Sequence, residues 1–79
     1  MRTKLEELRK QIDEIDERIT SLLAKRMKVV KAIGQLKKKN NMPILDKSRW
    51  QKVIKSKKGY IKKIWKIIHD EALRIEQSI

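Results

Sequence analysis

Three charged residues of this 79-residue chain occupy positions where a helical pattern predicts apolar side chains. Arg26 continues the apolar spacing that precedes it, and Lys37 follows eleven residues later, which is about three helical turns. The two cations would lie about 16 Å apart on one helix face, so their side chains could hold a small dianion between them. Glu76 lies near the apolar face of a later helix, where a structural ion pair or contact with a bound ligand would explain it.

A further cation, Arg9, precedes Arg26 by seventeen residues, or about 25 Å along a helix. It cannot reach the same small ligand from within one straight helix. If that helix pairs antiparallel with a second copy, Arg9 of one chain can approach Arg26 of the other. Without such pairing, Arg9 is a solvated residue beside the apolar stripe.

The common catalytic constellations are missing from the sequence. It has no glycine-rich phosphate loop, no cysteine and no cluster of metal-ligating residues, so we expect neither a metal nor a cofactor. His69 has no cysteine or serine partner by motif, and we interpret it as a structural residue at the helix surface or core edge. Chemistry without a nucleophile or a metal would depend on positioning and electrostatics.

The apolar spacing predicts the helix that carries the first cations. Apolar residues step by three and four, which is typical of the seam of a long packed helix. These residues are Leu5, Leu8, Ile12, Ile15, Ile19, Leu22, Val29, Ile33 and Leu36. We predict one helix over residues 4–39, ended by the sequence NNMP at 40–43. At about 1.5 Å per residue this helix would be roughly 50 Å long. Two shorter helices cannot cover a stripe of that length, so the rest of the stripe packs against a second copy or stays exposed.

Two shorter helices follow. Asp46 stands where an N-cap belongs, and we predict a helix over residues 46–57 that Gly59 ends. Apolar residues at helical spacing predict a third helix over residues 60–78. With no strand pattern, the fold class is all-α, with residues 1–79 as a single domain of one long, one short and one medium helix.

The formal net charge of +12 predicts an anionic partner or a solvated lysine-rich face. Between residues 37 and 63 the single acid is Asp46. No apolar run approaches the roughly 20 residues that span a bilayer, and the first residues are not signal-like. The absence of cysteine fits a reducing compartment. We therefore expect a soluble cytoplasmic protein without membrane contact.

Five segments in order resemble the all-helical chorismate mutase family. They are residues 8–16 (LRKQIDEID), 22–26 (LLAKR), 33–37 (IGQLK), 43–49 (PILDKSR) and 67–76 (IIHDEALRIE). The resemblance implies an isomerase, an intramolecular transferase that converts chorismate to prephenate in the shikimate pathway toward phenylalanine and tyrosine. It also implies an intertwined homodimer through the first helix, no cofactor, and no metal.

The resemblance also assigns roles to residues. It implies that Arg26 and Arg9 of the partner chain hold the two substrate carboxylates, with help from Arg49. By the same resemblance, Lys37 and Glu76 contact the ether oxygen of chorismate. The list of candidate site residues is completed by Asp46, which matches the position near the substrate hydroxyl.

The chain departs from the family pattern at three places. Trp50 stands where many members have glutamate, and Ala72 where serine is frequent. The segment between Arg49 and Trp65 is also about ten residues shorter than in typical members. These departures bear on how the site closes over its substrate more than on the fold.

Other functions remain open from the sequence. An isochorismate pyruvate-lyase would share this fold and much of this site. A basic helical dimer could bind nucleic acid, although the sequence has no nucleic-acid-binding motif, and we do not expect nucleic acid as the partner. A coiled-coil dimer without a ligand is a third possibility, which Arg26 argues against because a cation in an apolar seam costs stability unless an anion meets it.

Overall fold

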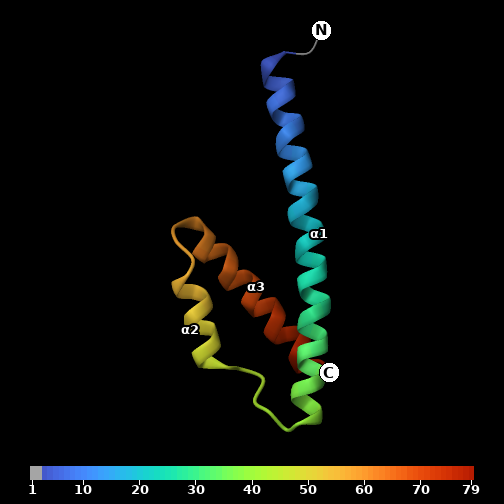
Figure 1. The fold of residues 1–79 in the computed structure, drawn as a ribbon, viewed down its shortest axis with the longest axis vertical. Helices are drawn as coiled ribbons and strands as arrows, with labels where there is room; N and C mark the ends of the chain where they lie inside the picture. The colour runs from blue at the N-terminus through green and yellow to red at the C-terminus, as the bar shows by residue number, and fades with distance from the viewer. Residues whose placement is uncertain (1–2) are drawn as a thin grey trace.

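The computed structural model describes residues 3–79 and contains three α-helices in this range, with no strand. They are α1 (Lys4–Lys39), α2 (Lys47–Lys55) and α3 (Tyr60–Gln77). Figure 1 shows α1 as one long rod, with α2 and α3 folded back beside its C-terminal half. The predicted all-α class with three helices is confirmed. Within residues 3–79, no helix has both the length and the apolarity needed to cross a membrane.

Both ends of α1 are capped. At the start, the Thr3 side chain accepts a hydrogen bond from the backbone N–H of Glu6, which satisfies one free donor of the first turn. At the end, Asn41 adopts a positive φ of 54°, and the N–H of Met42 donates to the carbonyl of Lys37 at 2.8 Å. The helix covers the range that the apolar spacing predicts.

The N-terminus of α2 follows the expected chemistry, because the Asp46 carboxylate accepts a hydrogen bond from the backbone N–H of Arg49. The helix ends at Lys55, two residues before the predicted end. The next two N–H groups donate to carbonyls three residues back, at Val53 and Ile54, so the last turn tightens and stops.

The helix α3 begins directly after Gly59, whose φ of +60° suits a residue without a Cβ. It ends at Gln77, one residue before the predicted end. The break that we predict at Gly59 therefore separates the two shorter helices.

The core of the single chain lies where α3 crosses the C-terminal half of α1. Val30, Ile68 and Ala72 are its buried apolar side chains among residues 3–79. Gly34 is also buried, and a Cβ there would lie 2.6 Å from Cδ1 of Ile79. The same Cβ would lie 3.2 Å from the backbone Cα of Glu76, so α3 passes close enough to α1 here that a side chain would need a small shift.

The apolar stripe of α1 is left uncovered in the single chain. Nine large apolar residues are each between 44% and 62% exposed: Leu5, Leu8, Ile12, Ile15, Ile19, Leu22, Val29, Ile33 and Leu36. A continuous apolar surface of this length is typical of an interaction face. The stripe has the property that the predicted pairing with a second copy requires, and the pairing itself stays a prediction.

Candidate active site

A pocket of about 310 Å³ lies between the C-terminal half of α1, the start of α2 and one face of α3. It brings together five of the six residues that the sequence predicts for the site: Arg26, Lys37, Asp46, Arg49 and Glu76. Most of the remaining lining residues are apolar, among them Val30, Ile33 and Leu73. The mixture of a largely apolar wall with a few converging charges is typical of a small-molecule site.

Lys37 is held in the pocket by two contacts from other parts of the chain. Its Nζ donates a hydrogen bond to the backbone carbonyl of Ile44 at 2.6 Å and lies 2.9 Å from Oε1 of Glu76. The two charged side chains are 17% and 7% exposed, so both are largely removed from water. Because two groups contact this ammonium, the flexible lysine side chain holds its charge at a defined place in the pocket.

Two buried side-chain atoms of the pocket have no hydrogen-bond partner within residues 3–79, namely Nη1 of Arg26 and Oε1 of Glu76. The Glu76 oxygen is within ion-pair distance of Lys37, but the two groups are not aligned as a hydrogen bond. For Arg26 no such charge contact exists among these residues. A buried guanidinium N–H without an acceptor is costly, and an oxygen atom of an anionic ligand would satisfy it.

The α2 side of the pocket carries one anion and one cation. The Oδ1 atom of Asp46 accepts from the backbone N–H of Arg49 at 3.0 Å, and both residues are exposed. This cap fixes the first turn of α2 and with it the place from which the Arg49 guanidinium reaches the pocket.

Arg9 does not line this pocket. It is an exposed residue on the N-terminal half of α1. The structure of the single chain therefore leaves its predicted role, as the contribution of a second copy, a prediction.

Two aromatic residues of the pocket lie outside the predicted site. Trp50 on α2 and His69 on α3 both line it, and their rings are stacked with centroids 3.8 Å apart and planes 15° from parallel. Our interpretation of His69 as a purely structural residue omitted its position in this lining. A signal was available, because His69 precedes Glu76 by seven residues and so shares its helix face.

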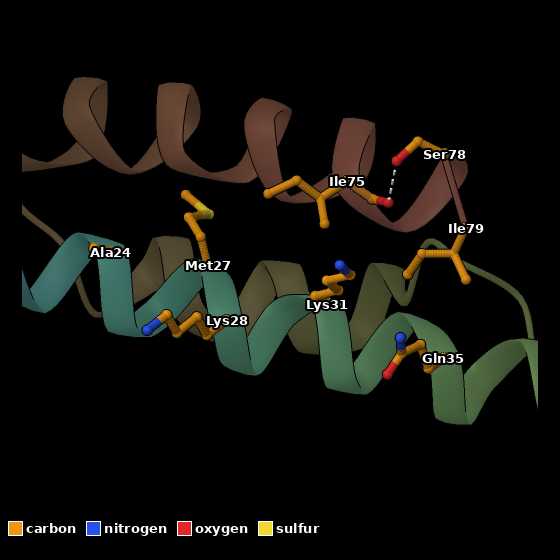
Figure 2. Close-up of a pocket in the computed structure, with 8 residues that line it drawn as sticks. All are labelled: Ala24, Met27, Lys28, Lys31, Gln35, Ile75, Ser78 and Ile79. Carbon is orange, nitrogen blue, oxygen red and sulfur yellow. Dashed lines mark hydrogen bonds between the residues drawn. The ribbon is translucent and has the colours of Figure 1, made fainter.

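A larger hollow of about 610 Å³ lies elsewhere along the contact between α1 and α3 (Figure 2). It is lined by Ala24, Met27, Lys28, Lys31, Gln35, Ile75, Ser78 and Ile79, and shares no residue with the first pocket. Its charged groups are two exposed lysines, with no arginine or carboxylate side chain beside them. The smaller pocket is the one in which charged side chains converge, so we take it as the candidate site.

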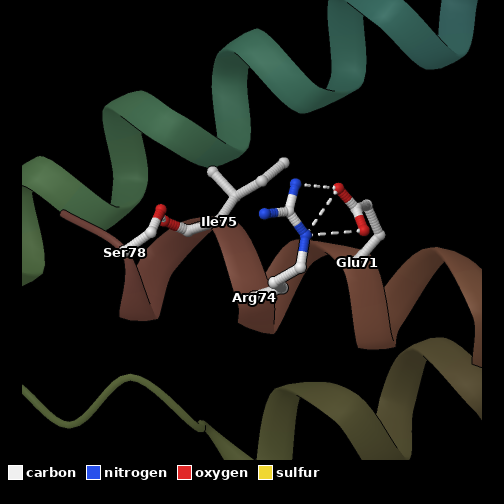
Figure 3. A network of polar contacts seen from close by, with 4 residues as sticks. All are labelled: Glu71, Arg74, Ile75 and Ser78. Atoms are coloured by element: carbon white, nitrogen blue, oxygen red, sulfur yellow. Dashed lines mark hydrogen bonds and ion pairs between the residues drawn. The ribbon is translucent and has the colours of Figure 1, made fainter.

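An ion pair on the exposed side of α3 is separate from the pocket (Figure 3). The Nε of Arg74 donates to both carboxylate oxygens of Glu71, at 3.0 and 3.1 Å. This hydrogen bonding lowers the pKa of Glu71 and raises the pKa of Arg74. Among residues 3–79 there is no group of three or more histidine, cysteine, aspartate or glutamate residues that could hold a metal ion.

Comparison with known proteins identifies relatives over most of the chain. The family model of chorismate mutase type II matches residues 8–77. A solved structure, described as a conserved hypothetical protein from Pyrococcus furiosus, is 38% identical in sequence with a TM-score of 0.87. The match covers 96% of this chain and 99% of that one, so the two share the whole three-helix arrangement.

Two curated proteins match parts of the chain. A bifunctional chorismate mutase/prephenate dehydratase from Aquifex aeolicus is 56% identical over 41 residues, which are 52% of this chain and 11% of that protein. A chorismate mutase from Methanocaldococcus jannaschii is 44% identical over 46 residues, 58% of this chain and 46% of that protein. The matched part is therefore less than half the length of each curated relative. The family model spans almost all of this sequence, and the chain belongs to the chorismate mutase type II family.

Proposed function

We propose that the chain is an isomerase that rearranges chorismate to prephenate, a step toward phenylalanine and tyrosine. The observation that carries this proposal is the buried, unpartnered Nη1 of Arg26 in a pocket that also holds Lys37 and Arg49. Three cations around an apolar cavity of about 310 Å³ suit a compact dianion. Chorismate has two carboxylates on a small carbon skeleton and fits that description. The expected compartment is the cytoplasm, because the cysteine-free sequence needs no oxidising environment.

The proposed reaction is an intramolecular rearrangement in which a carbon–carbon bond forms while the carbon–oxygen bond of the ether breaks. It needs no proton transfer, no nucleophile and no cofactor from the protein. Holding the two ends of the substrate together lowers the barrier by restricting unproductive conformations. In this account Arg26 and Arg49 bind the carboxylates, which fixes the substrate in its compact form.

Charge accumulates on the ether oxygen as its bond to carbon breaks. A fixed cation beside that oxygen stabilises the transition state more than the ground state. We assign this role to Lys37, because the Ile44 carbonyl and Glu76 hold its ammonium in place before the substrate arrives. Glu76 would make the second contact to the oxygen, and Asp46 would contact the substrate hydroxyl.

The proposal includes a homodimer that pairs α1 antiparallel with α1 of a second copy. The exposed apolar stripe of α1 supports it, as does the distribution of charge along the helix. Six of the ten acids of the chain lie between residues 6 and 17, whereas the half of α1 from residue 18 to 39 has only basic charged residues. Antiparallel pairing would set the acidic half of each helix beside the basic half of the other, and would bring Arg9 toward the partner's pocket.

The test is an absorbance assay of the purified protein with chorismate, with the product identified by nuclear magnetic resonance. We expect prephenate as product, and Arg26→Ala should lower kcat/KM by about 10²-fold or more because a fixed charge contact is lost. Arg18→Ala is the matched control, since Arg18 is an exposed arginine on the same helix outside the pocket.

Two outcomes would contradict the proposal. One is a folded wild-type protein that leaves chorismate unchanged. The other is an Arg26→Ala variant that is as active as Arg18→Ala. The same samples should also be given isochorismate, because release of pyruvate from it, without turnover of chorismate, would identify a lyase on this fold.

A further inference from the structure

Arg49 is the exposed cation of the candidate site, whereas Arg26 and Lys37 are partly buried. The side-chain hydrogen bonds and ion pairs found within residues 3–79 include none from the Arg49 guanidinium. No contact of its own therefore fixes this side chain before a ligand binds. Its place in the pocket depends on where the backbone of the first turn of α2 lies.

The position of α2 is set mainly by α3. The helix has nine residues and none of them is buried. Within residues 3–79 its close backbone contacts to another helix are with α3 and not with α1, and α3 lies between the two in Figure 1. Arg26 and Lys37 belong to α1, so the position of Arg49 relative to them is transmitted through α3 and through the loop that joins α1 to α2.

The first turn of α2 meets α3 in the ring pair of Trp50 and His69. Trp50 directly follows Arg49, and its indole is stacked on the imidazole with centroids 3.8 Å apart and planes 15° from parallel. Two stacked flat rings restrict both the separation and the relative tilt of the elements that carry them. His69 shares its helix face with Glu76, so the stack joins the turn that carries Arg49 to the face of α3 that lines the pocket.

We propose that Trp50 is a positioning residue, whose stack on His69 holds the first turn of α2 against α3 and so places the Arg49 guanidinium in the pocket. This inference rests on the proposed function of the pocket. The effect of Trp50 passes through Arg49, which is assigned to a substrate carboxylate. Loss of the stack should therefore weaken substrate binding, and it should change KM more than kcat.

The experiment is a double-mutant cycle in which KM and kcat for chorismate are measured at one pH for Trp50→Ala, Arg49→Ala and the double variant. Trp50→Ala should raise KM about three- to tenfold, and by no more than Arg49→Ala does, because a displaced guanidinium loses at most its whole contact. In the Arg49→Ala background, Trp50→Ala should change KM by less than about twofold, because the group that the stack positions is absent.

Conservative variants separate the ring pair from the identity of either residue. Trp50→Phe and His69→Phe each keep two aromatic rings in contact, so KM should stay within about twofold of the wild-type value. His69→Ala removes the stack from the side of α3 and should reproduce the KM of Trp50→Ala. It also makes the same comparison if Trp50→Ala does not fold.

A matched control weakens another contact between this part of the chain and α3. The ammonium of Lys57, just after α2, lies 4.1 Å from the ring centroid of Trp65 on α3, and neither residue lines the site. Lys57→Gln should therefore leave KM within about twofold of the wild-type value, because the stack is intact.

Each contrary result is distinct. An equal rise in KM on Trp50→Ala with and without Arg49 would overturn the positioning role, because Trp50 would then act independently of that arginine. Phenylalanine variants no better than the alanine variants would overturn it as well, and so would a Lys57→Gln variant with the KM of Trp50→Ala. All three results leave the proposed function intact. A folded wild type that does not turn over chorismate would overturn the proposed function, and this inference with it.

Discussion

At the scale of single residues, the pocket is organised around Lys37. Its ammonium contacts a backbone carbonyl from the loop that follows α1 and a carboxylate from α3, so three parts of the chain meet at one atom. Spacing alone predicts that Arg26, Lys37 and Glu76 face a common interior. It does not predict the contact with Ile44, because the path of a loop depends on turn geometry rather than on periodicity. It also leaves out His69, since a lone histidine has no distinguishing motif.

The first prediction concerns the contact between Glu76 and the reacting oxygen. A carboxylate beside an oxygen that gains negative charge repels it, whereas a protonated carboxyl or an amide can donate a hydrogen bond to it. In Glu76→Gln the amide can donate to that oxygen, so we expect kcat to stay within about threefold of the wild-type value or to exceed it.

The control for this prediction is Glu76→Leu, which has a similar size and no donor. Its kcat should fall by about tenfold or more, because the contact to the oxygen is lost. A Glu76→Leu variant as fast as Glu76→Gln would show that residue 76 does not contact the reacting oxygen in the proposed way.

The second prediction concerns the exposed ion pair of α3. Hydrogen bonding to Arg74 lowers the pKa of Glu71 in the folded chain below its ordinary value of 4.5. The pair therefore stabilises the fold above that value, and the contribution is lost as pH falls through the lowered pKa. Glu71→Gln should melt slightly below the wild type at neutral pH, and the two melting temperatures should converge in acid. A difference that grows in acid would contradict this assignment.

At the scale of elements, the caps and breaks of the helices follow from local sequence. Asp46 caps α2 and Gly59 separates the shorter helices, as their types and positions predict. The C-terminal end of α2 differs from the predicted end. The N–H groups of Ser56 and Lys57 donate to carbonyls three residues back rather than four, and such bonds are close in energy to those of an α-helix. The role of Gly34 was also not predictable, since a close approach between two helices depends on their crossing and not on either sequence alone.

The third prediction tests this close approach. In Gly34→Ala, the new methyl group would lie 3.2 Å from the backbone Cα of Glu76, which is tighter than an ordinary contact, so α3 must shift slightly. The end of the Ile79 side chain, 2.6 Å away, can rotate out of the way. We expect overpacking to cost about 1–3 kcal/mol, offset in part by the better helix propensity of alanine, which is worth about 1 kcal/mol. Because Glu76 moves with α3, kcat/KM should fall by about tenfold or more.

Gly59→Ala provides the comparison, because a Cβ at residue 59 meets no atom within 4 Å and only the positive φ is strained. It should cost about 1 kcal/mol of stability and leave kcat/KM unchanged. Thermal unfolding and steady-state kinetics of the two variants separate packing at the site from backbone strain away from it. Full activity in Gly34→Ala would show that the pocket tolerates a displaced α3.

At the scale of the whole molecule, the single chain is incomplete as an enzyme in the proposed account. It extends 60 Å along its long axis, but its buried apolar side chains cluster where α3 crosses α1. The N-terminal half of α1 carries an apolar stripe, an acidic surface and Arg9, and every residue from 4 to 21 is exposed in the single chain. Sequence periodicity predicts this excess of apolar surface correctly. The partner that would cover it is inferred from charge complementarity and from the family.

The most direct test of the account is complementation between two inactive variants, Arg9→Ala and Arg26→Ala. If each site takes Arg26 from one chain and Arg9 from the other, a mixed dimer has one intact site and one site that lacks both arginines. Unfolding the two variants together and refolding them as an equal mixture should then restore about a quarter of the wild-type activity, because half of the dimers are mixed. A mixture no more active than the two variants refolded separately would contradict a site shared between chains.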